Sequence, residues 1–86
     1  MAKIRYDITV DLHGLRGDEA ERKVRNLLTT TVNRRKSILI VHGVGQGILR
    51  ERIRRLLQNL PQVLEFRPGE DYLLPGLSGV TAVWLR

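Results

Sequence analysis

Residues 37–47 read SILIVHGVGQG, and this stretch decides the expected fold. Residues 37–41 are an apolar run of β-forming residues, which is typical of a central strand buried on both faces. Glycines follow at alternate positions, Gly43, Gly45 and Gly47, and a helical pattern opens directly after them. A strand, a glycine loop and a helix start in this order present backbone N–H groups and a positive helix dipole to an anion. The stretch therefore predicts a phosphate-binding loop, with a tight turn that binds nothing as the structural alternative.

Two amphipathic helices are predicted from apolar residues that recur every three or four positions. The first covers about residues 18–33, with Asp18 expected as its N-cap and Glu21 completing a capping box. The second opens at Ile48 and ends near Asn59. The apolar positions are Ala20, Val24, Leu27, Leu28, Thr31 and Val32 in the first helix, and Leu49, Ile53, Leu56, Leu57 and Leu60 in the second. Each helix therefore has one face to bury.

Strands are predicted over residues 7–12, 37–41, 63–67 and 80–85, with a long loop at 70–79 before the last one. The order of elements is β-α-β-α-β-β. Because a helix separates the first two strands, we expect them to run parallel with a right-handed crossover. Both helices then cover one face of the sheet. The sequence predicts an α/β fold, a two-layer β-α-β-α-β-β sandwich with a four-stranded mixed sheet.

The composition indicates a single basic domain over residues 1–86. The chain has 15 Lys and Arg against 9 Asp and Glu, and this net charge of +6 favours a polyanionic partner such as nucleic acid. Cysteine is absent, which excludes disulfides, thiolate zinc sites and a cysteine nucleophile, and which fits a cytoplasmic location. No apolar run approaches the roughly 20 residues of a membrane span, so no membrane partner is expected.

The second predicted helix carries a basic face. Arg50, Arg52, Arg54 and Arg55 lie on its polar side with one acidic residue among them. Contact with phosphates and a solvated surface stand as equal alternatives for these arginines. Aromatic residues are few, so Trp84 is expected to pack against the sheet, and a base-stacking surface is not predicted.

A candidate chemical group arises where the first two strands end. Asp11 and His13 close the first strand, and His42 closes the second. Because ligands gather at the carboxyl ends of strands in α/β sheets, we expect these side chains to meet beside the glycine loop. A histidine can act as general base or acid, and a carboxylate can orient it. The structural alternative is that His13 caps a turn and that His42 hydrogen-bonds across the glycine loop.

This group of side chains suits phosphodiester chemistry. With RNA, a histidine could deprotonate the 2′-hydroxyl without a metal, whereas DNA requires attack by water, which a metal usually assists. Two histidines and one carboxylate would hold a transition metal only loosely, so no metal site is assigned. The sequence assigns no cofactor with certainty and leaves a divalent metal, Mg²⁺ or Mn²⁺, open. It contains no Walker loop, Rossmann fingerprint or serine nucleophile elbow.

Three sequence boxes resemble those of the Smr (small MutS-related) domain family. Residues 10–15 read VDLHGL, residues 42–50 read HGVGQGILR and residues 79–83 read GVTAV, in the order of the family's LDLHG, HGxGxGxLR and GxTxV boxes. The resemblance extends over about residues 7–86. It implies a fold similar to the C-terminal domain of bacterial translation initiation factor three. It also implies an endonuclease that nicks DNA or cleaves RNA, including messenger RNA on stalled ribosomes.

The resemblance also implies roles for individual residues. Asp11, His13 and His42 fall on the family's functional positions, and we predict them to be catalytic. Together with the basic helix, the glycine loop gives a predicted phosphate-binding set of Gly43, Gly45, Gln46, Gly47, Arg50 and Arg54. Val44 departs from the family, which often has Lys or Thr there, and the loop at 70–79 is more apolar than the glycine-rich loop expected.

Two functions of different classes follow from these observations. The first is an endonuclease of low sequence specificity that holds the phosphodiester at the glycine loop. The second is a non-catalytic module that binds nucleic acid or a ribosome, which the basic helix supports equally well and Val44 slightly favours. An enzyme for a small phosphorylated metabolite is a weaker third alternative. The choice between DNA and RNA, the metal dependence and the oligomeric state stay open at this stage.

Overall fold

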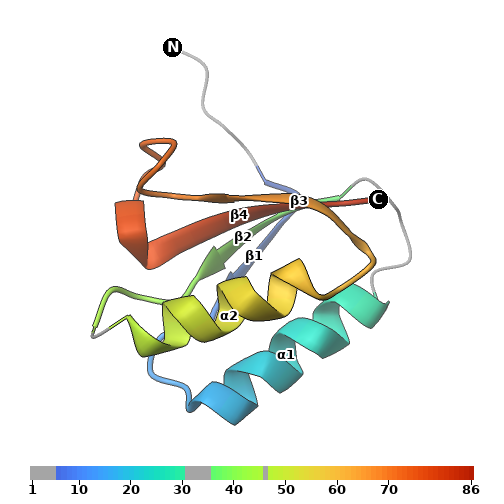
Figure 1. Ribbon diagram of the computed structural model, residues 1–86, viewed down its shortest axis with the longest axis horizontal. Helices are drawn as coiled ribbons and strands as arrows, with labels where there is room; N and C mark the ends of the chain where they lie inside the picture. The colour runs from blue at the N-terminus through green and yellow to red at the C-terminus, as the bar shows by residue number, and fades with distance from the viewer. Residues whose placement is uncertain (1–5, 31–35, 46) are drawn as a thin grey trace.

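The computed structural model describes residues 6–30, 36–45 and 47–86. Figure 1 shows a sheet with two helices on one of its faces. In chain order the elements are β1 (Ile8–Asp11), α1 (Gly17–Thr30), β2 (Ser37–Val41), α2 (Ile48–Gln58), β3 (Val63–Pro68), the 3-10 turn η1 (Leu77–Gly79) and β4 (Val80–Leu85). This order and the two layers confirm the predicted fold class. No helix in the described part of the chain is long and apolar enough to span a membrane.

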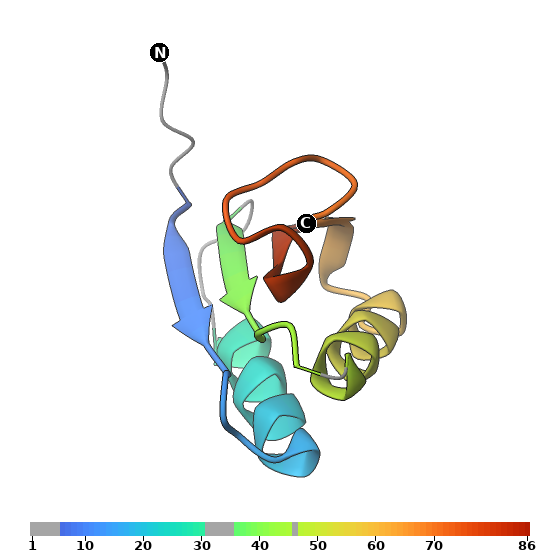
Figure 2. The same cartoon turned by 90° about the vertical axis from the view of Figure 1, so that its left-hand side faces the viewer.

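The sheet has four strands in the order β1-β2-β4-β3. β1 and β2 pair in parallel, with Asp11 beside Val41, whereas β4 pairs antiparallel with both β2 and β3. In Figure 2 the arrows of β1 and β2 point the same way, so the loops that follow them emerge at one edge. This is the edge where the sequence predicts the functional group.

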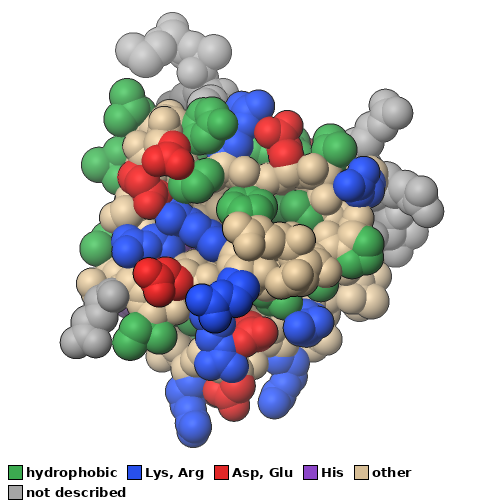
Figure 3. Space-filling model, in the orientation of Figure 1, with side chains coloured by type: hydrophobic (Ala, Val, Ile, Leu, Met, Phe, Trp, Pro, Cys, Tyr) green, Lys and Arg blue, Asp and Glu red, His purple; other side chains and the backbone are tan. Residues whose placement is uncertain are grey.

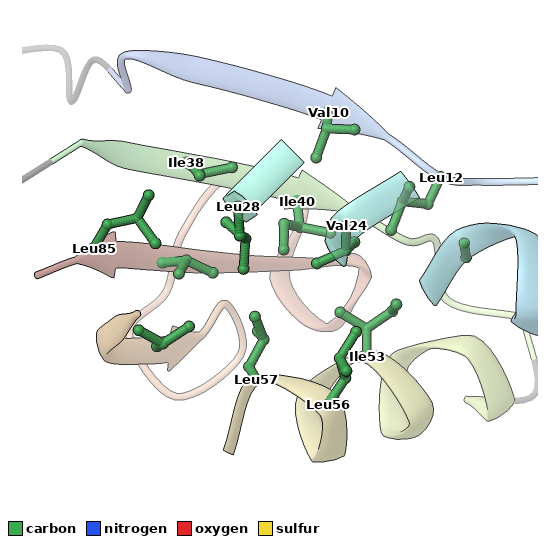
Figure 4. Close-up of a cluster of buried hydrophobic side chains, with 13 residues drawn as sticks. Val10, Leu12, Val24, Leu28, Ile38, Ile40, Ile53, Leu56, Leu57 and Leu85 are labelled. Atoms are coloured by element: carbon green, nitrogen blue, oxygen red, sulfur yellow. The ribbon is translucent and has the colours of Figure 1, made fainter. Parts of the chain in front are cut away.

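The main core lies between the sheet and the helices (Figure 4). Ile38 and Ile40 of β2 are fully buried in it, while Leu39 between them faces the other side of the sheet. Burying an aliphatic side chain of this size contributes about 1.5–3 kcal/mol. The buried members of the core are Val10, Leu12, Ala20, Val24, Leu28, Ile38, Ile40, Ile53, Leu56, Leu57, Val63, Val83 and Leu85. They include most of the positions that the helical periodicity predicts.

A smaller apolar cluster covers the opposite face of the sheet. Leu74, from the predicted long loop, is buried there against Val80 and Ala82 of β4. Trp84 is partly buried in the same cluster, and the Arg67 guanidinium lies 4.9 Å from the centre of its ring. The prediction that Trp84 is a packing residue is therefore confirmed. Through Leu74, the loop closes over the sheet instead of extending into solvent.

The start of α1 differs from the prediction. The Ala20 N–H already donates to the Arg16 carbonyl at 2.9 Å, so the helical ladder opens two residues earlier than expected. The Glu19 carboxylate accepts a hydrogen bond from the Arg16 N–H at 3.2 Å, which is the reciprocal contact of a capping box. Asp18 is therefore not the N-cap, and it lies in the first turn, where its charge favours the helix dipole. The predicted last turn, residues 31–33, lies outside the described residues.

Candidate functional site at the ends of β1 and β2

The carboxyl ends of β1 and β2 are joined at the site. Leu12 donates its N–H to the Val41 carbonyl at 2.7 Å, so the segments that begin at His13 and His42 leave the sheet side by side. A pocket of about 360 Å³ lies between them. Its lining residues are His13, Gly14, Leu15, His42, Gly43, Val44, Gly45, Gly47, Ile48 and Leu49. Both histidines and the three loop glycines thus share one pocket.

Asp11 and His13 form the exposed half of the site. The Asp11 carboxylate accepts a hydrogen bond from the His13 backbone N–H at 3.0 Å, and the same oxygen lies 3.7 Å from His13 Nδ1. The two side chains are 64% and 75% exposed, respectively. A turn of this Asx type places a carboxylate beside the imidazole without any further support. An exposed imidazole beside a carboxylate can exchange a proton with a bound substrate.

His42 forms the buried half of the site and is only 3% exposed. Its Nε2 lies 2.9 Å from the Thr81 hydroxyl, and its Nδ1 lies 3.1 Å from the Gly43 carbonyl oxygen. Burial lowers the pKa of His42 below its ordinary 6.5; the bond to Gly43 opposes this shift, and the charges of Arg54 and Arg50 add to it. The ring is therefore neutral at pH 7, and both of its nitrogens are engaged within the protein.

The Arg54 guanidinium is held by Glu70 and by Thr81. Its Nη1 and Nη2 donate to the two carboxylate oxygens of Glu70 at 2.8 and 2.7 Å, and its Nε donates to the Thr81 hydroxyl at 2.9 Å. The hydrogen bonds from Arg54 lower the pKa of Glu70 from 4.5 to about 2. The Arg54 side chain is only 16% exposed. The guanidinium predicted to contact phosphate thus faces Glu70 and Thr81 in this structure.

The glycine loop depends on backbone angles that favour glycine. Gly43, Gly45 and Gly47 have φ values of 81°, 40° and 82°. The N–H groups of His42 and Gly43 both donate to the Gly79 carbonyl at 3.0 Å, which ties the loop to the start of β4. Gly47 is the N-cap of α2, and no side chain among the described residues caps this helix. Because the first N–H groups of a helix have no acceptor within it, they are available to an anion at this end.

Arg50 lies over the start of α2. A Cβ atom at Gly47 would come within 2.5 Å of Arg50 Nη2, so the absence of a side chain there makes room for the guanidinium. The positive charge of Arg50 therefore adds to the helix dipole at the place where an anion would bind. Gln46, also predicted to contact phosphate, lies outside the described residues.

On the helical face of the molecule, basic side chains gather with acidic ones among them (Figure 3). Arg52 of α2 forms an ion pair with Glu21 of α1, and Arg25 of α1 lies 4.0 Å from the same carboxylate. Two arginines of the predicted basic face, Arg52 and Arg54, thus have carboxylate partners. The charge of this face is less one-sided than the helix sequence suggests.

Sequence reasoning missed two members of the site, Thr81 and Glu70. Thr81 is fully buried in β4, and its hydroxyl joins His42 to Arg54. A signal for it exists, because a hydroxyl within the apolar run VTAVWL must find a hydrogen-bond partner once it is buried. Glu70 has no such signal, since a glutamate in a loop is ordinarily solvated.

The donor set at the site does not form a metal centre. Among the described residues, no group of three or more His, Cys, Asp or Glu side chains is placed to hold a metal ion. Asp11 and His13 offer one carboxylate and one imidazole, and the ring nitrogens of His42 are already bonded. A Mg²⁺ or Mn²⁺ ion would therefore have one carboxylate and one imidazole here, and it would need water or a substrate phosphate for its remaining ligands.

Curated relatives of two kinds match the chain. The endonuclease MutS2 of Caldicellulosiruptor bescii is 36% identical over 81 residues, which is 93% of this chain and 10% of that protein. The ribosome rescue factor SmrB of Aliivibrio fischeri is 30% identical over 61 residues, which is 70% of this chain and 34% of that protein. The chain therefore spans only a small part of these curated relatives.

A solved structure and a family model agree with these relatives. The crystal structure of the Smr domain of Thermus thermophilus MutS2 matches with a TM-score of 0.75 and 36% identity, over 91% of this chain and 96% of that one. The family model that describes the Smr domain matches residues 10–86, which include the Asp11–His13 turn, the glycine loop and β4. The chain belongs to the Smr domain family.

Proposed function

We propose that this Smr domain is an endonuclease of low sequence specificity that holds a DNA or RNA phosphodiester at the glycine loop. One observation carries the proposal. An exposed Asp11–His13 pair stands at a pocket whose other wall is the glycine loop before the uncapped start of α2. A general base beside an anion-binding helix terminus is the minimum that phosphodiester cleavage requires.

The two walls of the pocket have separate tasks in this proposal. The first turn of α2 and Arg50 bind a phosphate oxygen, and they stabilise the extra charge that develops there in the transition state. His13 removes the proton from the attacking oxygen, while Asp11 stabilises the imidazolium that forms. Backbone and arginine contacts of this kind position a strand but do not read its bases, which accounts for low specificity.

The nucleophile distinguishes the two substrates. In RNA, His13 takes the proton of the 2′-hydroxyl, O2′ attacks phosphorus, and the 5′-oxygen leaves with a proton from solvent. The products are a 2′,3′-cyclic phosphate and a 5′-hydroxyl. In DNA, a water molecule must attack instead, and there a divalent metal such as Mg²⁺ or Mn²⁺ would assist. The proposed cleavage of RNA uses only His13 and Asp11, whereas a metal that assisted attack by water on DNA would be held by these side chains together with the substrate phosphate and water.

The alternative is a binding module that delivers a partner to nucleic acid or to a ribosome in the cytoplasm. The observation that favours it is the state of His42, whose two ring nitrogens are bonded inside the protein. That leaves His13 as the single accessible imidazole, because the chain has 2 histidines. A module of this kind would bind polyanions in a strongly salt-dependent manner without cleaving them.

Cleavage of labelled single-stranded RNA, single-stranded DNA and supercoiled plasmid tests the proposal, each with EDTA and with Mg²⁺ or Mn²⁺. Asp11→Asn should lower the rate on the true substrate, and Asp71→Asn, another exposed carboxylate of the same size, should leave it unchanged. RNA cleavage that survives EDTA indicates 2′-hydroxyl chemistry, whereas metal-dependent nicking of plasmid indicates attack by water. Salt-sensitive binding of all three without cleavage would reject the nuclease and support the binding module.

A further inference from the structure

We propose that Thr81, Arg54 and Glu70 are positioning residues of the site, which act through His42 on the shape of the glycine loop. The proposal rests on the proposed function in one respect, namely that the glycine loop holds the scissile phosphate. It assigns His42 itself to positioning and leaves His13 as the imidazole that exchanges protons with substrate.

The first step of the argument is a continuous chain of hydrogen bonds from the surface to the loop. Glu70 accepts two bonds from the Arg54 guanidinium, at 2.8 and 2.7 Å, and the Arg54 Nε–H donates to the Thr81 hydroxyl at 2.9 Å. The same hydroxyl lies 2.9 Å from His42 Nε2, and His42 Nδ1 lies 3.1 Å from the Gly43 carbonyl oxygen. The first three links connect different elements and the last lies within the glycine loop, so these hydrogen bonds tie α2, the loop after β3, β4 and the glycine loop together.

The second step is that these hydrogen bonds allow only one arrangement of protons when His42 is neutral. The Gly43 carbonyl only accepts, so Nδ1 carries the ring proton, and Nε2 must then accept. The Thr81 hydroxyl receives a hydrogen bond from Arg54, and its own proton is free to be donated to Nε2. Because Arg54 can only donate, it sets the direction of the whole chain. Glu70 fixes Arg54 in turn, through two parallel bonds that hold the plane of the guanidinium.

The third step links His42 to the phosphate pocket. His42 and Gly43 both donate their backbone N–H groups to the Gly79 carbonyl at 3.0 Å, so the first residues of the loop are held from two sides. The side chain of His42 adds the third contact through the Gly43 carbonyl. Gly43 has a φ of 81°, an angle at which the peptide could rotate if these bonds were lost. The chain therefore fixes the direction in which the loop faces the pocket.

The burial of His42 and Thr81 makes the loss of a bonding partner costly at this end of the arrangement. Thr81 is fully buried and His42 is 3% exposed, so a partner removed from either would not be replaced by bulk water. The charged groups that face His42 are Arg54 and Arg50 on α2 and Glu70 on the loop. The two arginines disfavour a charged imidazole and the glutamate favours it, so the protonation of His42 depends on all three groups.

Nuclear magnetic resonance of the histidine ring nitrogens tests whether these hydrogen bonds are formed. In the wild-type protein labelled with ¹⁵N-histidine, His42 should show a protonated Nδ1 and an unprotonated Nε2 at pH 7, and it should stay neutral below pH 6.5. Thr81→Val, which has nearly the same shape but no hydroxyl, should change the Nε2 resonance within this signature, because Nε2 loses the hydrogen bond that it accepts, and Thr81→Ser should restore the wild-type signature. Glu70→Gln should weaken it, whereas Glu65→Gln, which changes an exposed partner of Arg67, should not. A wild-type signature that persists in Thr81→Val would overturn the proposal.

Kinetics on the substrate identified above test the consequence for the loop. Thr81→Val should lower kcat by about 10-fold or more with a smaller change in KM, since a misplaced phosphate mainly affects the transition state. Thr81→Ser should recover most of the rate. Circular dichroism and thermal melting confirm that each variant is folded at the assay temperature. A Thr81→Val protein that changes the Nε2 resonance but cleaves at the wild-type rate would also overturn the positioning role.

The two proposals fail in different ways. A wild-type protein that cleaves none of the three substrates rejects the nuclease. The nitrogen signature still decides whether the hydrogen bonds from Glu70 to Gly43 are formed. In that case binding of a labelled oligonucleotide replaces the rate as the readout. Binding weakened at least 10-fold in Thr81→Val and restored in Thr81→Ser would support the control of the loop, and unchanged binding would reject it.

Discussion

His13 and His42 occupy equivalent places in the sequence and opposite environments in the structure. Each histidine follows a strand of the parallel pair and is itself followed directly by glycine. Yet the side chain of His13 is 75% exposed beside Asp11, while His42 is 3% exposed between Thr81 and Gly43. The comparison shows that two copies of one short motif can have different roles, one with an imidazole accessible to substrate and one with an imidazole that stabilises the interior.

The difference follows from strand register. Ile38, Ile40 and His42 alternate along β2 and its extension, so the imidazole of His42 points to the helix side, where the core continues. Residue 13 lies beyond an exposed Asp11 on the edge strand β1, where no further strand of the described sheet covers it. An imidazole beneath the sheet becomes part of the packing, and one at the rim remains accessible to substrate.

The largest expected effect is the loss of cleavage in His13→Ala. Removing a general base costs typically about 10²–10⁴-fold in rate, and His13 is the accessible imidazole of the site. The variant should fold as well as the wild-type protein, because exposed substitutions usually change stability by less than about 0.5 kcal/mol. Initial rates and chemical denaturation of the same preparation provide the two measurements. A rate within about threefold of the wild type would remove the contrast between the two histidines.

The same substitution at the buried histidine should lower stability as well as the rate. His42→Ala leaves the Thr81 hydroxyl without its acceptor and the Gly43 carbonyl without its donor, inside the protein. An unsatisfied buried group costs about 1–3 kcal/mol, and we expect a loss of unfolding free energy in this range. Urea denaturation followed by circular dichroism measures it, with His13→Ala as the matched control. Equal stabilities of the two variants would contradict the assignment of His42 to the packed interior.

The buried environment of His42 should also make the stability of the fold depend on pH. The pKa of His42 is lowered by burial, so just below pH 6.5 the unfolded chain binds a proton that the folded chain does not. Stability should therefore fall as the pH decreases from 7.5 to 5, and this decrease should be smaller in His42→Gln. The depressed pKa of Glu70, about 2, acts in a separate window, because its contribution is present above pH 4.5 and is lost only towards pH 2. Thermal melting between pH 5 and 7.5 thus isolates His42, and a His42→Gln protein with the wild-type pH dependence would reject this account.

The sequence predicts the fold and the placement of His13 and His42 at one pocket for one reason. Both depend on backbone periodicity and on the rule that parallel strands end at one edge, and these are local or topological properties. The chain order of the elements and the helix at 48–58 follow from them. Whether residues 42 and 81 face the core could be inferred from alternation along their strands.

The contacts that decide the role of each side chain could not be predicted in the same way. Arg54 shares its polar helix face with Arg50 and Arg52, and a helical wheel does not show that a carboxylate 16 residues later will fold back onto it. That contact depends on how the loop at 70–79 crosses the sheet, where Leu74 is buried among β4 residues. The first turn of α1 was misplaced for a related reason, because the tight turn after Leu12 sets the first helical hydrogen bond at Arg16.

The smallest effect should come from the two glycines that follow the histidines, and here the two sites should behave alike. Gly14 and Gly43 have φ values of 85° and 81°, and alanine pays about 1–2 kcal/mol in this region of backbone space. A Cβ at Gly14 would meet nothing within 4 Å, and one at Gly43 would lie 3.6 Å from His13 Cβ, an ordinary contact. Gly14→Ala and Gly43→Ala should therefore destabilise the fold by similar amounts in denaturant titrations. A much larger loss at Gly43 would mean that the loop is strained beyond its backbone angle, and that His42 holds it against this strain.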